Sequence, residues 1–387
     1  ANPWDSQVNS EPGFAFENGK AYHLKMKIKG SVAGEFGAVF QNPDGYKGCG
    51  DFPTIKVTTD WKEVDVTTTC NGDNALRLLL NIGKYAGTLY IDDFEVYYTK
   101  SSNTIPLTDE EKKEALTPVL QNWIYGMMEA TEGKVKAWDV VNEALSGEDK
   151  DGDGKFDLQS AKRGNVKPDD AKNNFYWQDY LGDINYVRTA VAAARKGFAD
   201  AGGNPEDLKL FINDYNLESD WDQNGKLKSL IKWIKDWEAD GVTKIDGIGS
   251  QMHISCYGNP QTQEAKKNAI ENMLKLMAES GKLVRISELD MGYVDANDKE
   301  VKTADMTEEQ HKEMRALYEF VVKKYLELIP ENQQWGICQW CATDSPANSG
   351  WRPGLPVGLW DLDYYRKHTY AGFAAGLGAP EYWKEAK

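Results

Sequence analysis

The pattern of hydrophobic and polar positions changes once along the chain, near residue 105. Residues 1–100 contain short runs in which apolar and polar residues alternate, separated by turns rich in glycine, asparagine, aspartate and proline. The alternating runs are 21–29, 37–41, 54–58, 62–68, 75–82 and 88–98. Such alternation is typical of half-buried antiparallel strands, so this part is predicted to be a β-sandwich.

After residue 107 the apolar positions recur at helical spacing. Thr108 and Glu111 have the spacing of a capping box, which predicts a helix that extends to about residue 129. Strands are predicted near 135–143, 209–214, 246–254, 284–290 and 336–342, and further helices near 183–201, 225–239, 262–279, 307–328 and 366–376. Apolar strands that alternate with amphipathic helices indicate parallel βα units.

This change of pattern predicts two domains: a sandwich over 1–100, a linker over 101–107 and an α/β domain over 108–387. Five strands suit an open doubly wound sheet. A closed eight-strand barrel would need three more βα units, which the first domain lacks because it has no helical pattern. No stretch approaches the roughly 18 uninterrupted apolar residues of a membrane helix, so no transmembrane segment is expected.

Charge and aromatic content narrow the range of partners. The chain has 61 acidic and 45 basic residues, a formal net charge of −16. Such a surface repels phosphate backbones, which argues against a nucleic-acid partner, an anionic membrane surface or an acidic polysaccharide. Solubility alone is the alternative explanation of this charge. The 13 Trp and 19 Tyr include several beside carboxylates and amides, a combination that suits a sugar ring.

The five cysteines do not predict a redox or metal centre. An odd number excludes complete pairing within the chain, although Cys49 and Cys70 could form one bridge. Cys338 and Cys341 have a redox or zinc spacing, but they lie in a predicted buried strand. Residues three apart on a strand point to opposite faces, so this pair is not expected to bridge or to share a metal.

Two of the predicted strands end in a glutamate. Residues 138–144 read Trp-Asp-Val-Val-Asn-Glu-Ala and contain Glu143, while residues 285–290 read Arg-Ile-Ser-Glu-Leu-Asp and contain Glu288. The carboxyl ends of parallel strands are where active sites of barrel enzymes are built. A single such glutamate would more often form a salt bridge or a helix cap. Two of them on different strands suit glycosidic bond cleavage, which needs a proton donor and a nucleophile.

These two segments strongly resemble the signature segments of the glycoside hydrolase family 10 endo-β-1,4-xylanases. Segments 211–216, 246–253 and 335–340, the last followed by Trp351-Arg352, fit the same order, and the resemblance covers about 105–378. It implies a (β/α)8 TIM barrel that hydrolyses internal bonds of xylan with retention of configuration. Xylan and xylo-oligosaccharides are the implied ligands, and no metal or organic cofactor is required for catalysis.

The resemblance also assigns residues. Glu143 is implied as the general acid/base and Glu288 as the nucleophile, with carboxyl groups about 5–5.5 Å apart. Asn142 is implied to bond the 2-hydroxyl of the attacked sugar, and Gln251 and His253 to orient the nucleophile and that sugar. For His253 a satisfied buried histidine is the alternative. The other implied substrate contacts are Tyr215, Trp340, which floors the site, and Trp351, which lies over it.

The sequence departs from the family in one large respect, because the three βα units that precede the strand of Glu143 are missing. We therefore expect the chain to be the C-terminal piece of a longer enzyme, with the missing units supplied by the full-length chain or a second chain. Residues 1–100 resemble the back part of an inserted carbohydrate-binding module of families 4 and 22, without its first strands. Its candidate ligand contacts, for each of which a core or turn role is an equal alternative, are Trp4, Gln7, Phe40, Gln41 and Tyr46.

An acidic segment begins six residues after Glu143. It has the Asp-x-Asp-x-Asp-Gly spacing of a calcium loop, but position twelve is Ser160, where a bidentate glutamate is expected. The candidate ligands of a structural calcium ion are Asp149, Asp151, Asp153 and Asp157. A solvated acidic loop is the alternative.

Two other functions remain open from the sequence. With three barrel units missing, the chain could bind glycan and cleave nothing, or it could be a retaining β-1,4-glucanase on the same fold. The family resemblance implies a bacterial protein that is secreted, periplasmic or at the cell surface, with its signal peptide outside this sequence.

Overall fold

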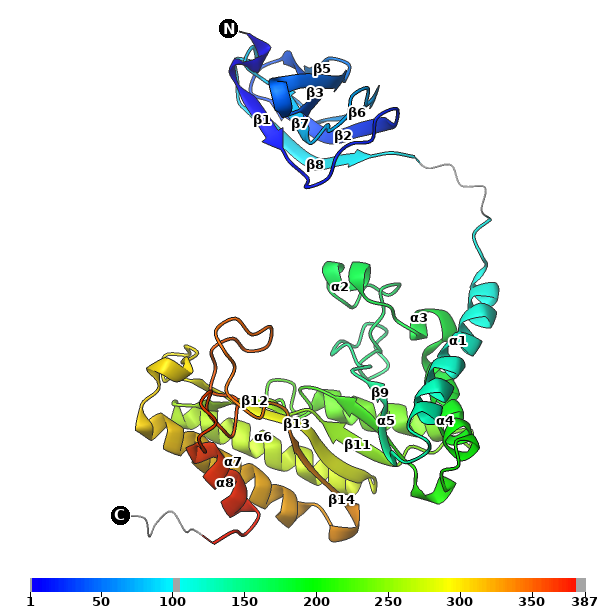
Figure 1. Ribbon diagram of the computed structural model, residues 1–387, viewed down its shortest axis with the longest axis vertical. Coiled ribbons are helices and arrows are strands. Elements are labelled where there is room, and N and C mark those ends of the chain that lie inside the picture. Colours follow the sequence, from blue (N-terminus) through cyan, green and yellow to red (C-terminus); the bar gives the residue numbers. More distant parts are fainter. Residues whose placement is uncertain (1, 100–104, 381–387) are drawn as a thin grey trace. The chain divides into compact units, whose positions relative to one another are not determined.

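The structure is a computed structural model that describes residues 2–99 and 105–380. The chain divides into two compact units, Ala1–Pro106 and Leu107–Lys387 (Figure 1). Residues 101–104 of the predicted linker lie outside the described residues.

The first unit consists of antiparallel sheets packed face to face. Its strands are β1 (Gln7–Ser10), β2 (Ala21–Gly30), β3 (Gly34–Asn42), β4 (Lys47–Asp51), β5 (Ile55–Val57), β6 (Lys62–Thr69), β7 (Arg77–Asn81) and β8 (Leu89–Tyr97). One sheet has the order β1-β7-β3-β4 with β5 also on β3, and the other has the order β6-β2-β8. The alternation seen in the sequence places one face of each strand in the core.

Burial inside this unit corrects one candidate residue and one candidate bridge. Phe40 on β3 is 0% exposed and its ring lies 5.0 Å from that of Phe52, so it belongs to the core and not to a ligand surface. The reason is the strand period: Phe40 points inward, while its neighbours Val39 and Gln41 point to the other face. Cys49 and Cys70 are both buried as free thiols, so the bridge that the sequence allowed is not formed.

The second unit alternates helices with parallel strands. Its strands are β9 (Ala137–Asn142), β10 (Lys209–Asp214), β11 (Gly247–Ser250), β12 (His253–Tyr257), β13 (Leu283–Val294) and β14 (Gln334–Gln339). Its helices are α1 (Asp109–Ala130), α2 (Pro168–Asn173), α3 (Gln178–Leu181), α4 (Asp183–Asp200), α5 (Gly225–Glu238), α6 (Pro260–Glu279), α7 (Glu308–Leu328) and α8 (His368–Gly376). Apolar side chains of the sheet and of the helices that cover it form one core.

All strand pairs of this sheet are parallel. The order is β9-β10-β11-β13-β14, and β12 continues alongside β13 where β11 ends. The predicted strand 246–254 is thus two strands, because Met252 between them has a left-handed backbone with φ of 55°. The sheet is strongly curved, since Arg285 on β13 forms an ion pair with Asp139 on β9, although two strands separate them.

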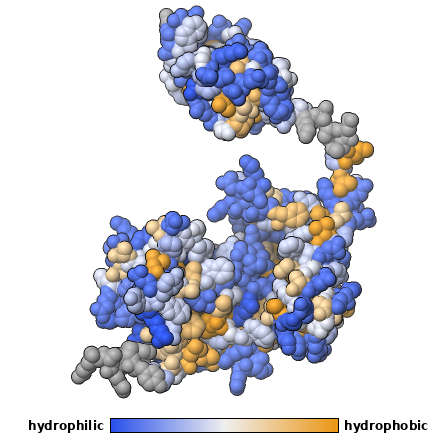
Figure 2. Space-filling view, in the orientation of Figure 1, coloured by the Kyte–Doolittle hydropathy of each residue, from blue (hydrophilic) through white to orange (hydrophobic). Residues whose placement is uncertain are grey.

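Both outer strands of this sheet have a free edge over the part of the chain that the structure describes. β9 pairs only with β10, and β14 pairs only with β13. Next to the edge of β9, the apolar stripe of α1 is only partly covered, and Trp123 is 68% exposed. A cavity of about 320 Å³ between α1, α4 and β9 is lined mainly by apolar side chains, among them Leu120, Ile124, Trp138 and Val140. Figure 2 shows hydrophobic surface along the exposed part of α1.

The first helix begins as the sequence predicts. The Thr108 hydroxyl accepts a hydrogen bond from the Glu111 amide at 3.2 Å, and the Glu111 carboxylate accepts one from the Thr108 amide at 2.8 Å. This reciprocal capping box satisfies two backbone donors. None of the described helices combines the length and the apolar character that crossing a bilayer requires.

Candidate active site

Glu143 follows directly after the end of β9. Its backbone has a φ of 54°, in the left-handed region that a residue with a side chain seldom adopts. Two hydrogen bonds hold it there: its amide donates to the carbonyl of Asn213 at 2.8 Å, and its carbonyl accepts from Gln159 Nε2 at 2.7 Å. Unusual backbone of this kind persists where the surroundings fix it, and such positions cluster at functional sites.

Glu288 lies on β13, and both of its carboxylate oxygens have a partner. Oε1 accepts a hydrogen bond from Asn213 Nδ2 at 3.0 Å, and Oε2 lies 3.2 Å from His253 Nε2. The side chain is largely buried. A carboxylate held at both oxygens has one orientation, which suits attack at a fixed position.

A network of amides joins the two glutamates. Gln251 Nε2 donates to Glu143 Oε1 at 2.8 Å and lies 3.4 Å from Asn142 Oδ1. Asn213 Nδ2, which bonds Glu288, also donates to Asn142 Oδ1 at 2.9 Å. The structure therefore brings Glu143, Glu288, Asn142 and Gln251 into one site.

Asn213 needs a glycine on the neighbouring strand. In the register of the sheet it is paired with Gly249 of β11 on one side and Asn142 of β9 on the other. A Cβ at Gly249 would lie 2.3 Å from Asn213 Oδ1. The Ser287 hydroxyl donates to that same oxygen at 2.6 Å, so the amide orientation is fixed from two directions.

His253 connects Glu288 to a buried acid. Its Nδ1 lies at an ion-pair distance of 3.1 Å from Asp290 Oδ1, and Asp290 is fully buried. The other oxygen of Asp290 accepts a hydrogen bond from Trp351 Nε1 at 2.7 Å. Arg352 donates to the backbone carbonyls of Ile254 and His253 and lies 3.3 Å from Asp290. The loop that carries Trp351 is thereby anchored to the same acid that holds His253.

Aromatic side chains border the two carboxylates. The Trp340 ring lies 5.9 Å from the His253 ring in an edge-on arrangement, and the Trp351 ring lies 4.6 Å from it. They are 53% and 41% exposed, so their faces are open to a ligand. Tyr215 lies at the end of β10 with the Lys226 ammonium 3.4 Å from its ring centre. Burial raises the pKa of Tyr215, and the charges of Asp214 and Glu143 add to this effect.

We expect the contribution of His253 to stability to depend on pH. Burial lowers its pKa, but the carboxylates of Asp290 and Glu288 outweigh burial, so the net shift is upward. A histidine whose pKa is raised in the folded state stabilises that state, and the effect is complete below the unfolded-state pKa of about 6.5. This stabilisation is lost as the pH rises through the folded-state pKa. The melting-temperature gap between the protein and His253→Gln should therefore be larger near pH 5.5 than near pH 9.

His311 is a control for which stability should change with pH in the opposite direction, because burial lowers the pKa of His311. The protein should gain stability relative to His311→Gln as the pH rises. The difference in melting temperature from the unchanged protein is measured for each variant across this pH range. If neither difference changed with pH, or if both changed in the same direction, the His253 contacts with the two carboxylates would not be maintained in solution.

The structure places the other candidate residues outside this network. On the first unit, the Gln7 amide donates to Asn81 Oδ1 at 2.7 Å, and the Gln41 amide donates to the carbonyl of Tyr46 at 3.3 Å. Asn81 of β7 pairs with both Gln7 of β1 and Gly37 of β3, so Gln7 and Gln41 project from the same face of one sheet. Trp4 and Tyr46 are exposed.

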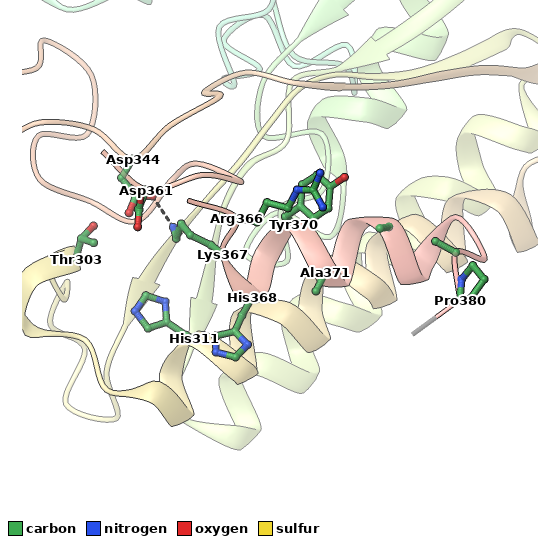
Figure 3. A pocket seen from close by; sticks show the side chains of 12 residues that line it. Thr303, His311, Asp344, Asp361, Arg366, Lys367, His368, Tyr370, Ala371 and Pro380 are labelled. Carbon is green, nitrogen blue, oxygen red and sulfur yellow. Dashed lines mark hydrogen bonds and ion pairs between the residues drawn. The ribbon is translucent and has the colours of Figure 1, made fainter. Parts of the chain in front are cut away.

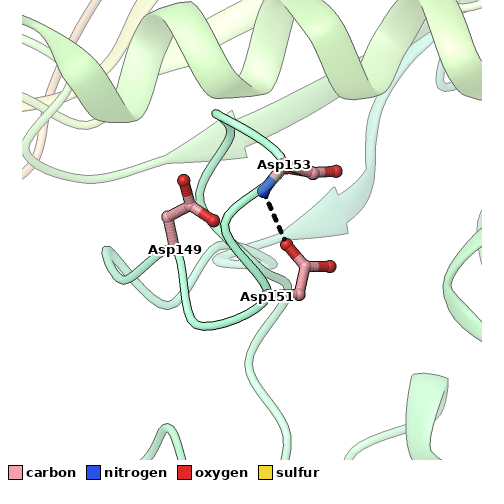
Figure 4. A group of neighbouring side chains, drawn as sticks. All are labelled: Asp149, Asp151 and Asp153. Atoms are coloured by element: carbon pink, nitrogen blue, oxygen red, sulfur yellow. Dashed lines mark hydrogen bonds between the residues drawn. The ribbon is translucent and has the colours of Figure 1, made fainter.

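Three of the four acidic candidates for calcium converge. Carboxylate oxygens of Asp149, Asp151 and Asp153 lie within 4.8 Å of one another (Figure 4). Asp149 already accepts hydrogen bonds from the amides of two glycines in the loop. Asp157 does not join them, because it is buried and accepts from the Lys150 amide at 3.0 Å. Its inclusion among the ligands is wrong in this geometry.

A separate cavity of about 670 Å³ lies beside α7 and α8 (Figure 3). Its charged lining includes a buried ion pair between Lys367 and Asp344. Burial lowers the pKa of Lys367 in spite of this carboxylate. Lys367 also donates to the carbonyls of Pro356 and Gly358, so its role is to fix the loop before α8. The cavity shares no lining residue with the amide network that joins Glu143 to Glu288.

Sequence reasoning did not assign four residues of the network: Asn213, Ser287, Asp290 and Arg352. Each stands inside a segment that the sequence singled out, within two positions of a residue that was assigned. Their roles depend on partners on other strands, which one sequence does not specify. The only local signal is a polar side chain at the end of an apolar strand, as in Ile212-Asn213-Asp214.

Two fixed carboxylates, one directly after β9 and one on β13 of the same parallel sheet, bordered by exposed tryptophans, are typical of glycoside hydrolases. The sequence model of glycosyl hydrolase family 10 matches residues 96–375, and the chain belongs to this family. An endo-beta-1,4-xylanase of Cellvibrio japonicus is 30% identical over 262 residues, which are 64% of this chain and 37% of that protein. Endo-1,4-beta-xylanase A of Thermotoga maritima is 30% identical over 279 residues, 71% of this chain and 22% of that protein. The chain thus spans well under half the length of these two relatives.

Solved structures show the same fold. Xylanase B of Clostridium stercorarium superposes with a TM-score of 0.53 at 24% identity, over 68% of each chain. A family 10 structure from Paenibacillus barcinonensis superposes with a TM-score of 0.52 at 25% identity, over 72% of this chain and 70% of that one. These likenesses confirm the α/β (β/α)8-barrel class for the second unit.

Proposed function

We propose that this chain carries the catalytic carboxylates of an endo-β-1,4-xylanase that cleaves internal bonds of xylan with retention of configuration. The observation that carries the proposal is the amide network that joins Glu143 to Glu288. The curated relatives named above are endo-xylanases, which favours xylan as the polymer. The double displacement uses side chains alone and needs no metal or organic cofactor.

In the proposed mechanism Glu288 attacks the anomeric carbon and forms a glycosyl-enzyme. Asn213 and His253 hold its two oxygens, so little reorientation is needed. Glu143 protonates the departing glycosidic oxygen and then takes a proton from the water that cleaves the ester. Gln251 donates a hydrogen bond to the Glu143 carboxylate and so holds this side chain in the site that it shares with Glu288.

The remaining candidates are assigned to the sugar. Asn142 would donate its amide hydrogens to the 2-hydroxyl, because its oxygen is already bonded to Asn213. The exposed faces of Trp340 and Trp351 would stack on sugar rings, and Tyr215 would contact the sugar beside Glu143.

We also propose that the barrel is completed by three βα units from the full-length chain or from a second chain. Barrel closure requires every strand to have two neighbours. The free edges of β9 and β14 and the exposed Trp123 beside the first of these edges support this proposal. A free strand edge beside uncovered apolar side chains otherwise invites aggregation.

The first unit is proposed to be a carbohydrate-binding module over residues 1–100, joined by 101–107 to the catalytic domain over 108–387. Gln7 and Gln41 on one sheet face offer amides, and the exposed Trp4 and Tyr46 offer aromatic surface. Because polymeric xylan does not enter cells, the proposed place of action is outside the cytoplasm, for a secreted, periplasmic or surface-bound bacterial protein.

Reducing-sugar release from xylan and from cellulose-type glucan tests the proposed function. Faster release from xylan is expected. Release mainly from glucan would identify a β-1,4-glucanase. Binding to xylan without any release would leave the chain as a glycan-binding fragment and would contradict the catalytic proposal for it.

A structural calcium ion at Asp149, Asp151 and Asp153 is a further part of the proposal. The convergence of three carboxylates favours it, although Ser160 at position twelve bonds Asp179 instead and cannot complete a calcium loop. Calcium that binds only the folded state stabilises it by about 2.7 kcal/mol at a hundredfold excess over Kd. Chelator should thus lower the melting temperature by several degrees, and Asp151→Asn should remove that shift. Superimposable melting curves with and without chelator would exclude the ion.

A further inference from the structure

The sandwich of the first unit is open along one side, between β1 and β8. β1 is the last strand of one sheet and β8 is the last strand of the other, and each has a single neighbour among the residues described. Val8 pairs with the core residue Leu80, and Val96 pairs with the core residue Leu24, so both point inward. Val8 is nevertheless 48% exposed.

Aromatic side chains on this open side are also uncovered. Phe14, Phe94 and Tyr98 are 57%, 42% and 41% exposed. Phe14 packs edge-on against Phe16, and Tyr98 packs edge-on against Tyr22; both of these partners are buried in the core. A cavity of about 560 Å³ lies there, with Phe14, Phe94, Val96 and Tyr98 in its lining and Leu78 at its floor. We call this feature the β1–β8 seam.

We propose that the β1–β8 seam is a docking site for one extended polypeptide segment that adds to the edge of β8. Its inward side chains would be apolar and fill the cavity, and its outward side chains would be lysine or arginine. A strand suits the seam because a free β8 edge offers backbone donors and acceptors beside an apolar cavity.

Charge decides what kind of segment fits. Asp92, Asp93 and Glu95 are exposed on β8. Asp93 forms an ion pair with Lys27, and in the strand register Asp92 and Glu95 stand opposite Lys27 and Lys25 of β2, so β8 offers three acids against two lysines. Opposite charges on paired strands stabilise, and like charges directly opposite each other destabilise. A second β8 from another copy would bring its own acids to this edge, so self-pairing is disfavoured and a basic segment is favoured.

Edge protection alone does not account for the seam. The irregular register of β8 near Asp93, which has a φ of 49°, and the acids beside it are features that prevent unwanted pairing. They protect the middle of the strand but leave Glu95–Tyr97 in regular register with β2. They also give no reason for inward-facing aromatic rings to be exposed.

The test uses the full chain and three ten-residue synthetic peptides. One alternates valine with lysine, and one alternates valine with glutamate. The third has the same residues as the first, with all of its valines placed before all of its lysines. The alternating valine–lysine peptide should bind at least tenfold more tightly than the other two by fluorescence anisotropy. It should also slow amide hydrogen exchange over Phe94–Tyr97.

Two variants and a control sharpen this test. Glu95→Lys, a surface change that leaves the core intact, should weaken the valine–lysine peptide and strengthen the valine–glutamate peptide. Phe94→Asp should weaken both, while Trp61→Ala, at an exposed tryptophan that does not line the seam, should weaken neither. Equal binding of all three peptides would overturn the proposal. So would exchange of Phe94–Tyr97 that is already slow in the free chain, or protection that arises from dimerisation without peptide.

Discussion

Replacement of Glu288 by alanine is expected to abolish turnover on every glycoside that the protein cleaves, by roughly 10⁴-fold or more in kcat/KM. The reason is that no other carboxylate of the network is in a position to replace it: Glu143 is held by Gln251, and Asp290 is buried behind His253. Initial rates on xylan and on an activated aryl xyloside measure this loss. Glu279→Ala, at an exposed glutamate near the end of α6, is the matched control and should leave both rates unchanged.

Glu143→Ala should behave differently, because an activated leaving group needs little protonation. We expect it to lose activity on xylan and to retain cleavage of the activated aryl xyloside. Azide should then raise its rate and yield a β-glycosyl azide, since the anion can approach where the Glu143 carboxylate was. If the Glu143 and Glu288 variants behaved alike on the activated substrate, the two roles would be wrongly assigned.

Lys226→Met is expected to be the most destabilising single change near the site. Lys226 Nζ lies 2.7 Å from Asp214 Oδ1, and both side chains are almost completely buried. Burial raises the pKa of Asp214, and the Lys226 ammonium opposes that shift. Removal of one partner of a buried pair costs about 3–5 kcal/mol, because the other charge stays buried without compensation. At about 2–4 °C per kcal/mol, the melting temperature should fall by roughly 10 °C.

Three comparisons check the cause of this loss. Lys228→Met, at an exposed lysine on the same helix, should change stability by at most about 0.5 kcal/mol. The double variant with Asp214→Asn should recover part of the loss, which measures the pairwise coupling. The deficit of Lys226→Met should also shrink as the pH falls, because protonation neutralises Asp214. A deficit that is independent of pH and of residue 214 would point to packing instead of charge.

This ion pair bears on the site as well as on stability. Asp214 accepts hydrogen bonds from the amides of Leu145 and Tyr215, at 3.1 and 2.9 Å. It therefore ties the end of β10 to the segment that follows Glu143. We expect Lys226→Met to impair catalysis even at temperatures where the variant remains folded.

Most of the second unit could be predicted from the sequence because apolar residues recur at regular spacing along its helices and strands. The predicted strand 209–214 coincides with β10, and the predicted helix 183–201 differs from α4 by one residue. The short helices α2 and α3 were not predicted, since four to six residues show no period. β1 and β4 in the first unit were missed for the same reason, and β4 reads Lys-Gly-Cys-Gly-Asp.

The site was predictable where chemistry is carried by a local motif. Glu143 and Glu288 stand out in the sequence as carboxylates at predicted strand ends, and the amide network joins them, although β13 continues past Glu288 to Val294. Asn213 does not stand out, because its role arises from the register that pairs it with Gly249 and Asn142. Phe40 was misplaced because alternation along β3 identifies two faces but not which of them is the core. Asp157 was misplaced because loop spacing does not say which carboxylate turns inward.

Covalent trapping shows whether Glu288 is the nucleophile of a retaining xylanase. The protein, in the form that releases sugar from xylan, is incubated with an activated 2-deoxy-2-fluoro-xylobioside, digested and analysed by mass spectrometry. We expect one glycosyl adduct, on the peptide that contains Glu288, and no adduct in Glu288→Gln. An adduct on Glu143 or another residue, or an enzyme that cleaves this substrate without a trapped intermediate, would contradict this role of Glu288.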